Sequence, residues 1–436
     1  MPDHAHSDDP AVQTQLNRLT MLSPGRDVLG LERISALMER LGNPHQNLPP
    51  VFHVAGTNGK GSTCAFLRAA LEAAGKAVHV YSSPHLVRFN ERIRVAGKLI
   101  DDATLAPLLS EVLDKSEDIQ PSFFEATTAV AFLAFARTPA DAAVIEVGLG
   151  GRLDATNVIE HPAVCGIAQL GIDHENFLLD PDNGPDLPPL ERIAFEKAGI
   201  AKTGVPLVTM AYSAPVAAQI ERIAAEKCCS FYPKGGVWDA VTYNGNLHYK
   251  DRGGKLKLPL PAMHGAHQAE NAALAVAMIR HQSAVDVPEA AIKAGVGWAH
   301  WPARLQRLAR GPLVGTREVW LDGGHNEAAG STIAAFLKER GQPFHLITGM
   351  LANKDARGLL EHFRGLTTRF TAVPVPGHPC HAPEELAAIA RDLGMESDTA
   401  GSIEEALVRA DLPVTLFLVS LYLAGAVLRA NNQVPD

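Results

Sequence analysis

The stretch at residues 51–63 constrains the fold more than any other part of this 436-residue chain. An apolar, β-prone run at 51–55 enters a loop that holds three glycines, and an apolar segment at 64–74 then predicts a helix. Lys60 and Ser62 lie between the two. Glycines let backbone N–H groups face an anion, while a lysine and a helix N-terminus add positive charge. The stretch therefore predicts a strand–loop–helix unit that binds polyphosphate.

The loop departs from the usual phosphate-binding pattern at one position, because Gly61 separates Lys60 from Ser62. An ordinary glycine turn would account for Gly56 and Gly59 alone. It would not account for a lysine and hydroxyl residues between a strand and a helix, and such a hydroxyl can ligate Mg²⁺. We therefore favour a phosphate site over a simple turn.

Composition argues against several classes of protein. Hydrophobic residues make up 46% of the chain and charged residues 20%, which favours a folded core over disorder. The formal net charge of −9 argues against a general nucleic-acid binder, since that role needs a basic face. The five cysteines lack zinc-ligand spacing. The adjacent pair Cys228–Cys229 is either redox-active or, as we favour for a cytosolic protein, two reduced thiols.

Neither end of the chain predicts export or membrane insertion. Residues 1–10 are polar, and we expect a disordered tail rather than a signal peptide. The most hydrophobic run, 412–428, is short for a membrane span and contains Pro413. A buried strand at 414–419 that leads into a core helix explains this run better. The sequence therefore predicts a cytoplasmic protein.

Strands and helices alternate after the loop, which predicts a parallel α/β sheet. Strands are expected at 77–81, 142–147, 163–168 and 206–210. Ligands of open α/β sheets bind outside the carboxyl ends of the strands. Residues 82–94 follow a strand end and carry a histidine and three arginines, so we favour a substrate loop over a solvated surface loop.

Two further residues at strand ends indicate a metal site. Glu146 lies in an apolar strand, where an ionised carboxylate is costly unless it is paired or binds a cation. Beside a phosphate loop, an acid in this place is the usual Mg²⁺ partner, although a structural salt bridge is the alternative. His174 follows the next strand. We favour a metal or phosphate role for it over a structural one.

A second alternation of strands and helices begins after a linker near residue 298. It predicts strands at 319–321, 344–348, 370–374 and 414–419, with helices between them. We therefore expect an α/β protein with two domains, a larger one at 1–298 and a smaller Rossmann-like one at 299–436.

Motifs along the chain resemble those of the folylpolyglutamate synthase family within the Mur ligase superfamily. They lie at 56–62, 82–86, 123–126, 146–157, 196–200, 267–271 and 322–326, in the family's order. The resemblance implies a P-loop ligase that activates a pterin carboxylate with ATP as an acyl phosphate and joins it to L-glutamate. The stretch at 122–125 resembles the dihydropteroate loop of the bacterial bifunctional enzymes, which implies both dihydrofolate synthase and folylpolyglutamate synthase activity.

The resemblance also implies roles for individual residues. It implies nucleotide contacts from Gly56, Thr57, Asn58, Gly59, Lys60, Gly61, Ser62, Asn271, Arg304, Asp322 and His325. It implies a pterin site at Gly30, Leu31, Ser122, Phe123, Phe124, Glu125, Leu153, Asp154 and Ala155.

The same resemblance implies two Mg²⁺ sites held by Ser83, Glu146 and His174, with a potassium requirement left open. Lys197 matches the lysine that the family carbamylates, a change that would turn a cation into an anionic oxygen donor beside the metal. We assign catalysis to Lys60, Lys197 and His174.

Some positions depart from the family pattern. Gly324 and Glu327 stand where the family commonly has Ala and Pro, and Ala303 stands where Gly is common before the arginine. Val419 precedes Ser420 where Gly-Ser is usual, and the loop between the histidine and lysine sites is longer than expected.

Two rival functions were weighed against this one. A Mur-type ligase acting on a UDP-linked cell-wall precursor would normally need an additional N-terminal domain, and only about 50 residues precede the loop. A P-loop NTPase switch would leave residues 82–94 and the second α/β domain without a role. We expect a monomer that binds L-glutamate and dihydropteroate or folates, without nucleic-acid or membrane partners.

Overall fold

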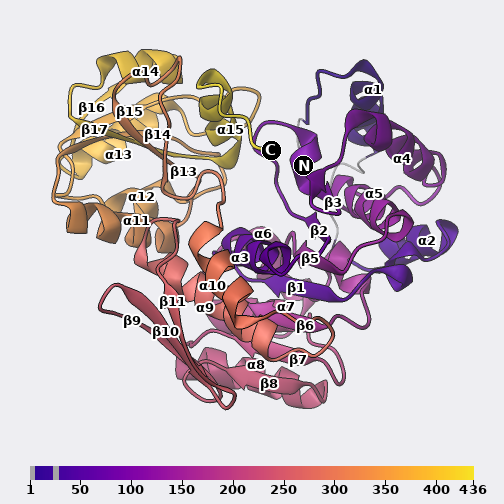
Figure 1. Cartoon of the computed structure of the whole chain (residues 1–436). Helices are drawn as coiled ribbons and strands as arrows, with labels where there is room; N and C mark the ends of the chain where they lie inside the picture. The colour runs from indigo at the N-terminus through magenta and orange to yellow at the C-terminus, as the bar shows by residue number, and fades with distance from the viewer. Residues whose placement is uncertain (1–4, 23–28) are drawn as a thin grey trace. The chain divides into compact units, whose positions relative to one another are not determined.

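The computed structural model describes residues 5–22 and 29–436, and the chain divides into two compact units (Figure 1). The first unit comprises Met1–Pro84, Arg88–Ala262 and Gln268–His300. The second comprises His85–Val87, Met263–His267 and Trp301–Asp436. Two short segments from the first 300 residues thus belong to the second unit.

An eight-stranded sheet forms the centre of the first unit, in the order β4-β3-β2-β5-β1-β6-β7-β8. The strands are β1 (Val51–Ala55), β2 (Val78–Tyr81), β3 (Ile93–Val95), β4 (Lys98–Leu99), β5 (Ala142–Glu146), β6 (Val164–Ile167), β7 (Pro206–Thr209) and β8 (Ser230–Pro233). Pairing is parallel from β2 to β8 and antiparallel between β2, β3 and β4. The predicted parallel sheet is confirmed. The sequence analysis missed β8, a half-exposed edge strand, and also β3 and β4, of which β3 begins within the predicted 82–94 loop.

Ten α-helices, of the described residues, accompany this sheet. They are α1 (Pro10–Leu22), α2 (Glu32–Arg40), α3 (Lys60–Ala73), α4 (Asp102–Asp114), α5 (Phe123–Arg137), α6 (Glu175–Leu178), α7 (Pro189–Ala198), α8 (Ala214–Glu226), α9 (Ala266–Arg280) and α10 (Glu289–Trp298). Helices α1, α2, α4 and α5 pack together, and α3 packs against α10, where Gly295 lies on the backbone of Ala70 (Figure 1). Helix α9 spans the change from the second unit to the first.

The expected disordered tail needs correction. Residues 1–4 lie outside the described residues, but 5–10 lead directly into α1. The Asp9 carboxylate accepts hydrogen bonds from the backbone N–H groups of Ala11 and Val12, both at 2.9 Å. This is a helix N-cap, and Ala5 is buried nearby in the chain. The polar composition of this segment reflects capping rather than disorder.

A small antiparallel sheet is formed by β9 (Asp239–Tyr243), β10 (Asn246–Asp251) and β11 (Gly254–Pro259). Its first hairpin turns at Asn244 and Gly245, whose φ angles of 46° and 68° suit the tight turn that an Asn-Gly pair favours.

The second unit is built on a six-stranded sheet in the order β12-β13-β17-β14-β15-β16. The strands are β12 (Gln306–Arg307), β13 (Glu318–Asp322), β14 (Phe344–Gly349), β15 (Arg369–Ala372), β16 (Glu396–Thr399) and β17 (Val414–Val419). The helices are α11 (Glu327–Arg340), α12 (Ala356–Glu361), α13 (Pro383–Asp392), α14 (Ile403–Arg409) and α15 (Leu421–Ala430). Pairing is parallel except at β12. The hydrophobic run at 412–428 is thus a buried strand and a helix, as predicted, and no helix of the described residues is long and apolar enough to span a membrane.

Candidate active site

The loop between β1 and α3 folds tightly around Lys60. Gly59 has a φ of 82°, which glycine adopts without strain, and its Cα lies so close to the Asn271 amide that a β-carbon would overlap it. The Lys60 amine donates hydrogen bonds to the carbonyls of Gly56 at 3.0 Å and Thr57 at 3.3 Å. The Thr57 hydroxyl in turn donates to the carbonyl of Gly171 at 2.8 Å. The structure therefore brings Asn271 and the predicted phosphate loop together.

Glu146 ends the strand next to this loop. Parallel pairing sets Glu146 beside Val54 of β1, and its carboxylate is buried. One of its oxygens accepts a hydrogen bond from the backbone N–H of Ser83 at 3.4 Å. Together with burial, the Glu146 charge raises the pKa of the Cys64 thiol in α3, while Lys60 lowers it. Two of the three predicted metal residues, Ser83 and Glu146, thus lie together beside the loop.

His174, the third predicted metal residue, is exposed at the start of α6, with a left-handed φ of 55°. Its backbone N–H donates to the Asp173 carboxylate at 2.8 Å. Among the residues that the structure describes, no three His, Cys, Asp or Glu side chains are arranged to hold a metal by themselves.

Lys197 is a buried amine on α7. Burial is the main cause that lowers its pKa to about 7, and the charge of Lys60 lowers it further. Asp173, Asp154 and Glu196 act in the opposite direction. The segments that carry Lys60, Asp154 and Asp173 are therefore all close enough to the Lys197 amine to act on it electrostatically. This amine therefore loses its proton more readily than the amine of an exposed lysine does.

Asp154 organises the loop that follows β5. Its buried carboxylate accepts hydrogen bonds from the N–H groups of Leu149 at 2.7 Å and Thr156 at 3.0 Å, and from the Thr156 hydroxyl at 2.5 Å. Burial raises the pKa of Asp154, and Lys60 opposes that effect. The Asp154 side chain therefore fixes the conformation of this loop, and its neighbours in sequence, Leu153 and Ala155, lie in the same loop.

Several predicted pterin residues share one apolar cluster. Phe123 and Ala155 are buried in it, and Leu31 and Phe124 pack against it. The Phe124 ring stacks at 5.9 Å from that of Tyr81 and lies directly on the backbone of Gly148.

Ser122 and Glu125 cap helix α5. The Ser122 hydroxyl accepts from the Glu125 N–H at 3.2 Å, and the Glu125 carboxylate accepts from the Ser122 N–H at 2.6 Å. Glu125 also pairs with Arg33 at 3.0 Å. These side chains are engaged within the protein, whereas Gly30 lies just before α2 at the edge of the described residues.

Sequence reasoning missed some residues of this region. The Tyr81 ring stacks against the Phe124 ring. Its position as the last residue of β2 could have indicated a place near the site. Arg33 was also missed as a site residue, since nothing local in the sequence indicates which carboxylate it approaches.

In the second unit, Asp322 ends β13 and binds the turn around it. Its buried carboxylate accepts from the N–H groups of Leu305 and Gly324, both at 2.7 Å. Burial raises the pKa of Asp322, while Arg304 lowers it. A β-carbon on Gly323 would lie 2.9 Å from the Arg304 guanidinium, and His325 contacts the Gly323 carbonyl at 2.9 Å. The predicted residues Arg304, Asp322 and His325 therefore form one local cluster.

The departures from the family pattern have physical consequences here. Ala303 adopts a φ of 53°, a left-handed conformation that costs a residue with a β-carbon about 1–2 kcal/mol. A β-carbon on Gly324 would lie 2.9 Å from Ala329, Asp322 and Ile333, so glycine suits this turn better than alanine. Glu327 begins α11 with a favourable negative charge in its first turn.

The chain has the features of a nucleotide-binding protein of the Mur ligase fold class. Its parallel sheet has a glycine–lysine loop after the central strand and a buried acid on the neighbouring strand, and a second α/β unit follows. No protein-family model matches the chain. The chain is 38% identical to the dihydrofolate synthase/folylpolyglutamate synthase of Bacillus subtilis, over 71% of this chain and 72% of that protein.

Solved structures agree with this similarity. The Escherichia coli FolC in complex with DHPP and ADP aligns with a TM-score of 0.85 at 31% identity, covering 98% of both chains. A bifunctional folylpolyglutamate synthase/dihydrofolate synthase with Mn, AMPPNP and L-glutamate bound aligns with a TM-score of 0.83 at 30% identity, covering 96% of this chain and 97% of that one. The chain belongs to the dihydrofolate synthase/folylpolyglutamate synthase family.

Proposed function

We propose that this protein is an ATP-dependent ligase that joins L-glutamate to dihydropteroate and to folates. The observation that carries the proposal is the gathering of Lys60, Glu146 and Lys197 around the ends of neighbouring strands, with the pKa of Lys197 lowered to about 7 by burial and by Lys60. Relatives solved with DHPP, ADP, AMPPNP and L-glutamate support the same class of substrates.

The nucleotide would be held by the β1–α3 loop. Residues Gly56 to Ser62 provide backbone amides and the N-terminus of α3, and Lys60 provides a full positive charge for the phosphates. Asn271 lies on this loop. We assign nucleotide contacts to Arg304, Asp322 and His325 as well, on the family resemblance.

The donor set fits a divalent metal of the Mg²⁺ or Mn²⁺ type. Ser83 and Glu146 offer hard oxygen donors, and Mg²⁺ is commonly held by one or two carboxylates together with substrate phosphates. When bound, the metal would neutralise developing negative charge on the phosphates. We assign Ser83 and Glu146 to one site and His174 to a second.

We also propose that Lys197 is carbamylated. In this reaction carbon dioxide adds to an uncharged amine, which loses one proton, and burial favours the uncharged amine of Lys197. The carbamate would be an anionic group beside the cationic Lys60. Replacement of Lys197 with alanine is expected to abolish turnover, and the intact mass of the native protein is expected to include the carbamate. A fully active Lys197→Ala enzyme would remove this role.

The proposed reaction has two displacement steps. A carboxylate oxygen of the pterin substrate attacks the γ-phosphorus of ATP, forming an acyl phosphate and releasing ADP. The amine of L-glutamate then attacks the acyl carbon, so that the amide bond forms, the carbon–oxygen bond to phosphate breaks and inorganic phosphate leaves with loss of an amine proton. The pterin itself would lie against the apolar cluster that contains Leu31, Phe123 and Phe124.

ADP release by the purified protein tests the proposal. We expect release in the presence of ATP and Mg²⁺ to depend on L-glutamate and to occur with both dihydropteroate and tetrahydrofolate, but not with a UDP-linked muropeptide. Lys60→Met is expected to reduce turnover at least about a hundredfold, whereas Lys76→Met, just beyond the other end of α3, leaves it unchanged. Release that ignores glutamate would contradict the ligase; activity with tetrahydrofolate alone would remove the dihydrofolate synthase half.

Three further assignments belong to the same proposal. We take residues 1–298 and 299–436 as the two domains, a monomer as the active form and the cytoplasm as the location. The division of the chain into two compact units near residue 300 supports the first. Cell fractionation and the mass in solution, expected near the 46.5 kDa of one chain, would test the last two.

A further inference from the structure

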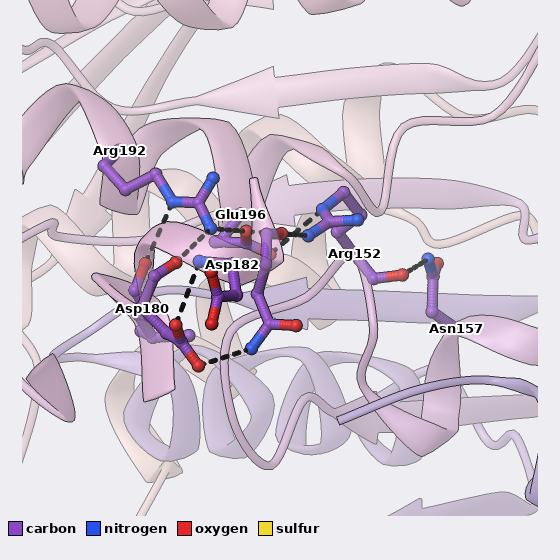
Figure 2. Close-up of polar contacts among 8 residues, drawn as sticks. Arg152, Asn157, Asp180, Asp182, Arg192 and Glu196 are labelled. Atoms are coloured by element: carbon purple, nitrogen blue, oxygen red, sulfur yellow. Dashed lines mark hydrogen bonds and ion pairs between the residues drawn. The ribbon is translucent and has the colours of Figure 1, made fainter. Parts of the chain in front are cut away.

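The carboxylate of Glu196 lies between two arginines at the end of α7 (Figure 2). Arg192 approaches it at 3.1 Å from one turn earlier, and both side chains are only 3% exposed. Arg152, from the loop after β5, donates to it at 3.0 and 3.2 Å through two nitrogens. The guanidinium groups of both arginines also lie over the Phe195 ring, at 5.2 and 5.4 Å.

The same two arginines hold the segment 178–184 against α7. Arg192 donates to the carbonyls of Leu178 at 3.1 Å and Asp180 at 3.5 Å, and Arg152 donates to the carbonyl of Asn183. Figure 2 shows Asp180 and Arg192 facing one another across this contact. A β-carbon on Gly184 would overlap the Arg192 guanidinium, so the segment approaches closely. The long loop between His174 and Lys197 is therefore held against α7 by these hydrogen bonds.

The backbone of the β5 loop is tied to the same place. The Arg152 N–H donates to the Glu196 carbonyl at 2.7 Å, and the Asn157 amide donates to the carbonyls of Arg152 at 2.9 Å and Gly199 at 3.2 Å. Glu196 therefore joins three segments of chain, and each carries a residue assigned above to the site: Asp154 after β5, His174 ahead of the clamped segment, and Lys197 next to Glu196 itself.

Stability alone does not account for this arrangement. Burying the Arg192–Glu196 ion pair costs desolvation that the Coulomb attraction often fails to recover, and apolar residues of similar volume are frequently as stable or more so. Such a network fixes the geometry of the chain more than it adds stability, because each donor and acceptor can form its hydrogen bonds in only a few arrangements. A bridge at the junction of three site segments thus favours a role in geometry.

We propose that Arg152, Glu196 and Arg192 are positioning residues that set the Lys197 and His174 segments for binding of a divalent metal with the nucleotide. The inference rests on the proposed function. The proposed role of the three side chains is to fix the positions of the three segments, and none of these side chains is placed against a substrate.

Metal binding measured without turnover tests this. The variants are Glu196→Gln, Arg192→Lys and Arg152→Lys, with Arg222→Lys as the control, since Arg222 forms an equally spaced but exposed pair with Glu226 on α8. Mn²⁺ is titrated by electron paramagnetic resonance in the presence of ADP, ADP affinity is measured without metal, and hydrogen exchange is followed at residues 176–184. Metal affinity commonly falls 10–100-fold when residues that orient the ligands are changed.

We expect the Mn²⁺ concentration at half-saturation to rise about tenfold in the Glu196 and Arg192 variants, with faster exchange at 176–184 and unchanged ADP affinity. The control should match the native protein. Arg152→Lys, which retains a cation at a partly exposed position, should give a smaller rise and keeps the test valid if Glu196→Gln fails to fold. Unchanged Mn²⁺ binding in folded variants would overturn the proposal. Losses of ADP affinity and melting temperature that accompany the loss of Mn²⁺ binding would also overturn it, because they indicate a purely structural bridge. Network-dependent Mn²⁺ binding without glutamate-dependent ADP release would support the network and contradict the proposed function.

Discussion

At the scale of single residues, Lys197 shows how burial determines chemistry. A lysine in water is charged at neutral pH, but desolvation and the charge of Lys60 lower the pKa of this one to about 7. Ala303 shows the reverse relation, in which a residue tolerates an unfavourable backbone conformation, with a φ of 53°, because the turn that carries Arg304 needs it.

The lowered pKa of Lys197 makes stability depend on pH. Its pKa of about 7 in the folded state lies below the ordinary value of 10.5, so the unfolded state binds more protons between these values. The free energy of unfolding of the unit that contains Lys197 should therefore rise with pH from about 7 toward 10, by up to about 1.4 kcal/mol per pH unit. Lys197→Met should flatten this rise.

Urea unfolding at pH 7, 8 and 9 in carbon dioxide-free buffers measures the effect. Lys250→Met, at an exposed lysine of β10, is the matched control and should keep the native slope. An unaltered slope in Lys197→Met would contradict a lowered pKa in the folded protein.

At the scale of elements, helix α3 has a glycine with positive φ at each end, but the two differ in their surroundings. Gly59, at the N-cap, touches Asn271, whereas Gly75, after the C-cap, has open space where a β-carbon would be. The φ angles are alike, 82° and 75°. The pair therefore separates the cost of backbone strain from the cost of disturbing the phosphate loop.

We expect Gly59→Ala and Gly75→Ala each to lower the free energy of unfolding by about 1–2 kcal/mol, because both place alanine in the left-handed region. Gly59→Ala should cost more, since its β-carbon displaces Asn271, and it alone should weaken ADP binding, by at least about tenfold. Calorimetric titration with ADP gives the comparison. Equal ADP affinity in the two variants would argue against this loop as the phosphate site.

At the scale of the whole molecule, the two units have hydrophobic clusters of their own. Phe132 belongs to a cluster formed within the first unit, and Phe417 belongs to one built on the sheet of the second. Cores separated in this way commonly unfold separately.

Scanning calorimetry is therefore expected to resolve two unfolding transitions. Phe132→Ala should lower one of them and Phe417→Ala the other, each by the equivalent of about 3–5 kcal/mol, the usual cost of emptying a buried phenylalanine site. If either variant shifted both transitions equally, the units would be folding as one.

Much of this molecule could be predicted because its signals are local. The strand at 414–419 matches its predicted bounds, since a continuous apolar pattern lies within the element itself. The short edge strands β8 and β16 escaped prediction because partly exposed, polar residues leave no such pattern. The prediction of disorder at residues 5–10 was wrong because their polar composition does not reveal that Asp9 caps the helix that follows.

The sequence by itself determined the β1–α3 loop, the buried acid of Glu146 and the alternation that builds both sheets, because each depends on neighbours along the chain. Only the tertiary structure decided that Lys60, Asp154, Asp173 and Lys197 share one electrostatic environment, and that Glu196 bridges two arginines. Burial and Coulomb interactions depend on distance in space, and residues as far apart in sequence as Lys60 and Lys197 come within range of one another only when the sheet brings their segments together.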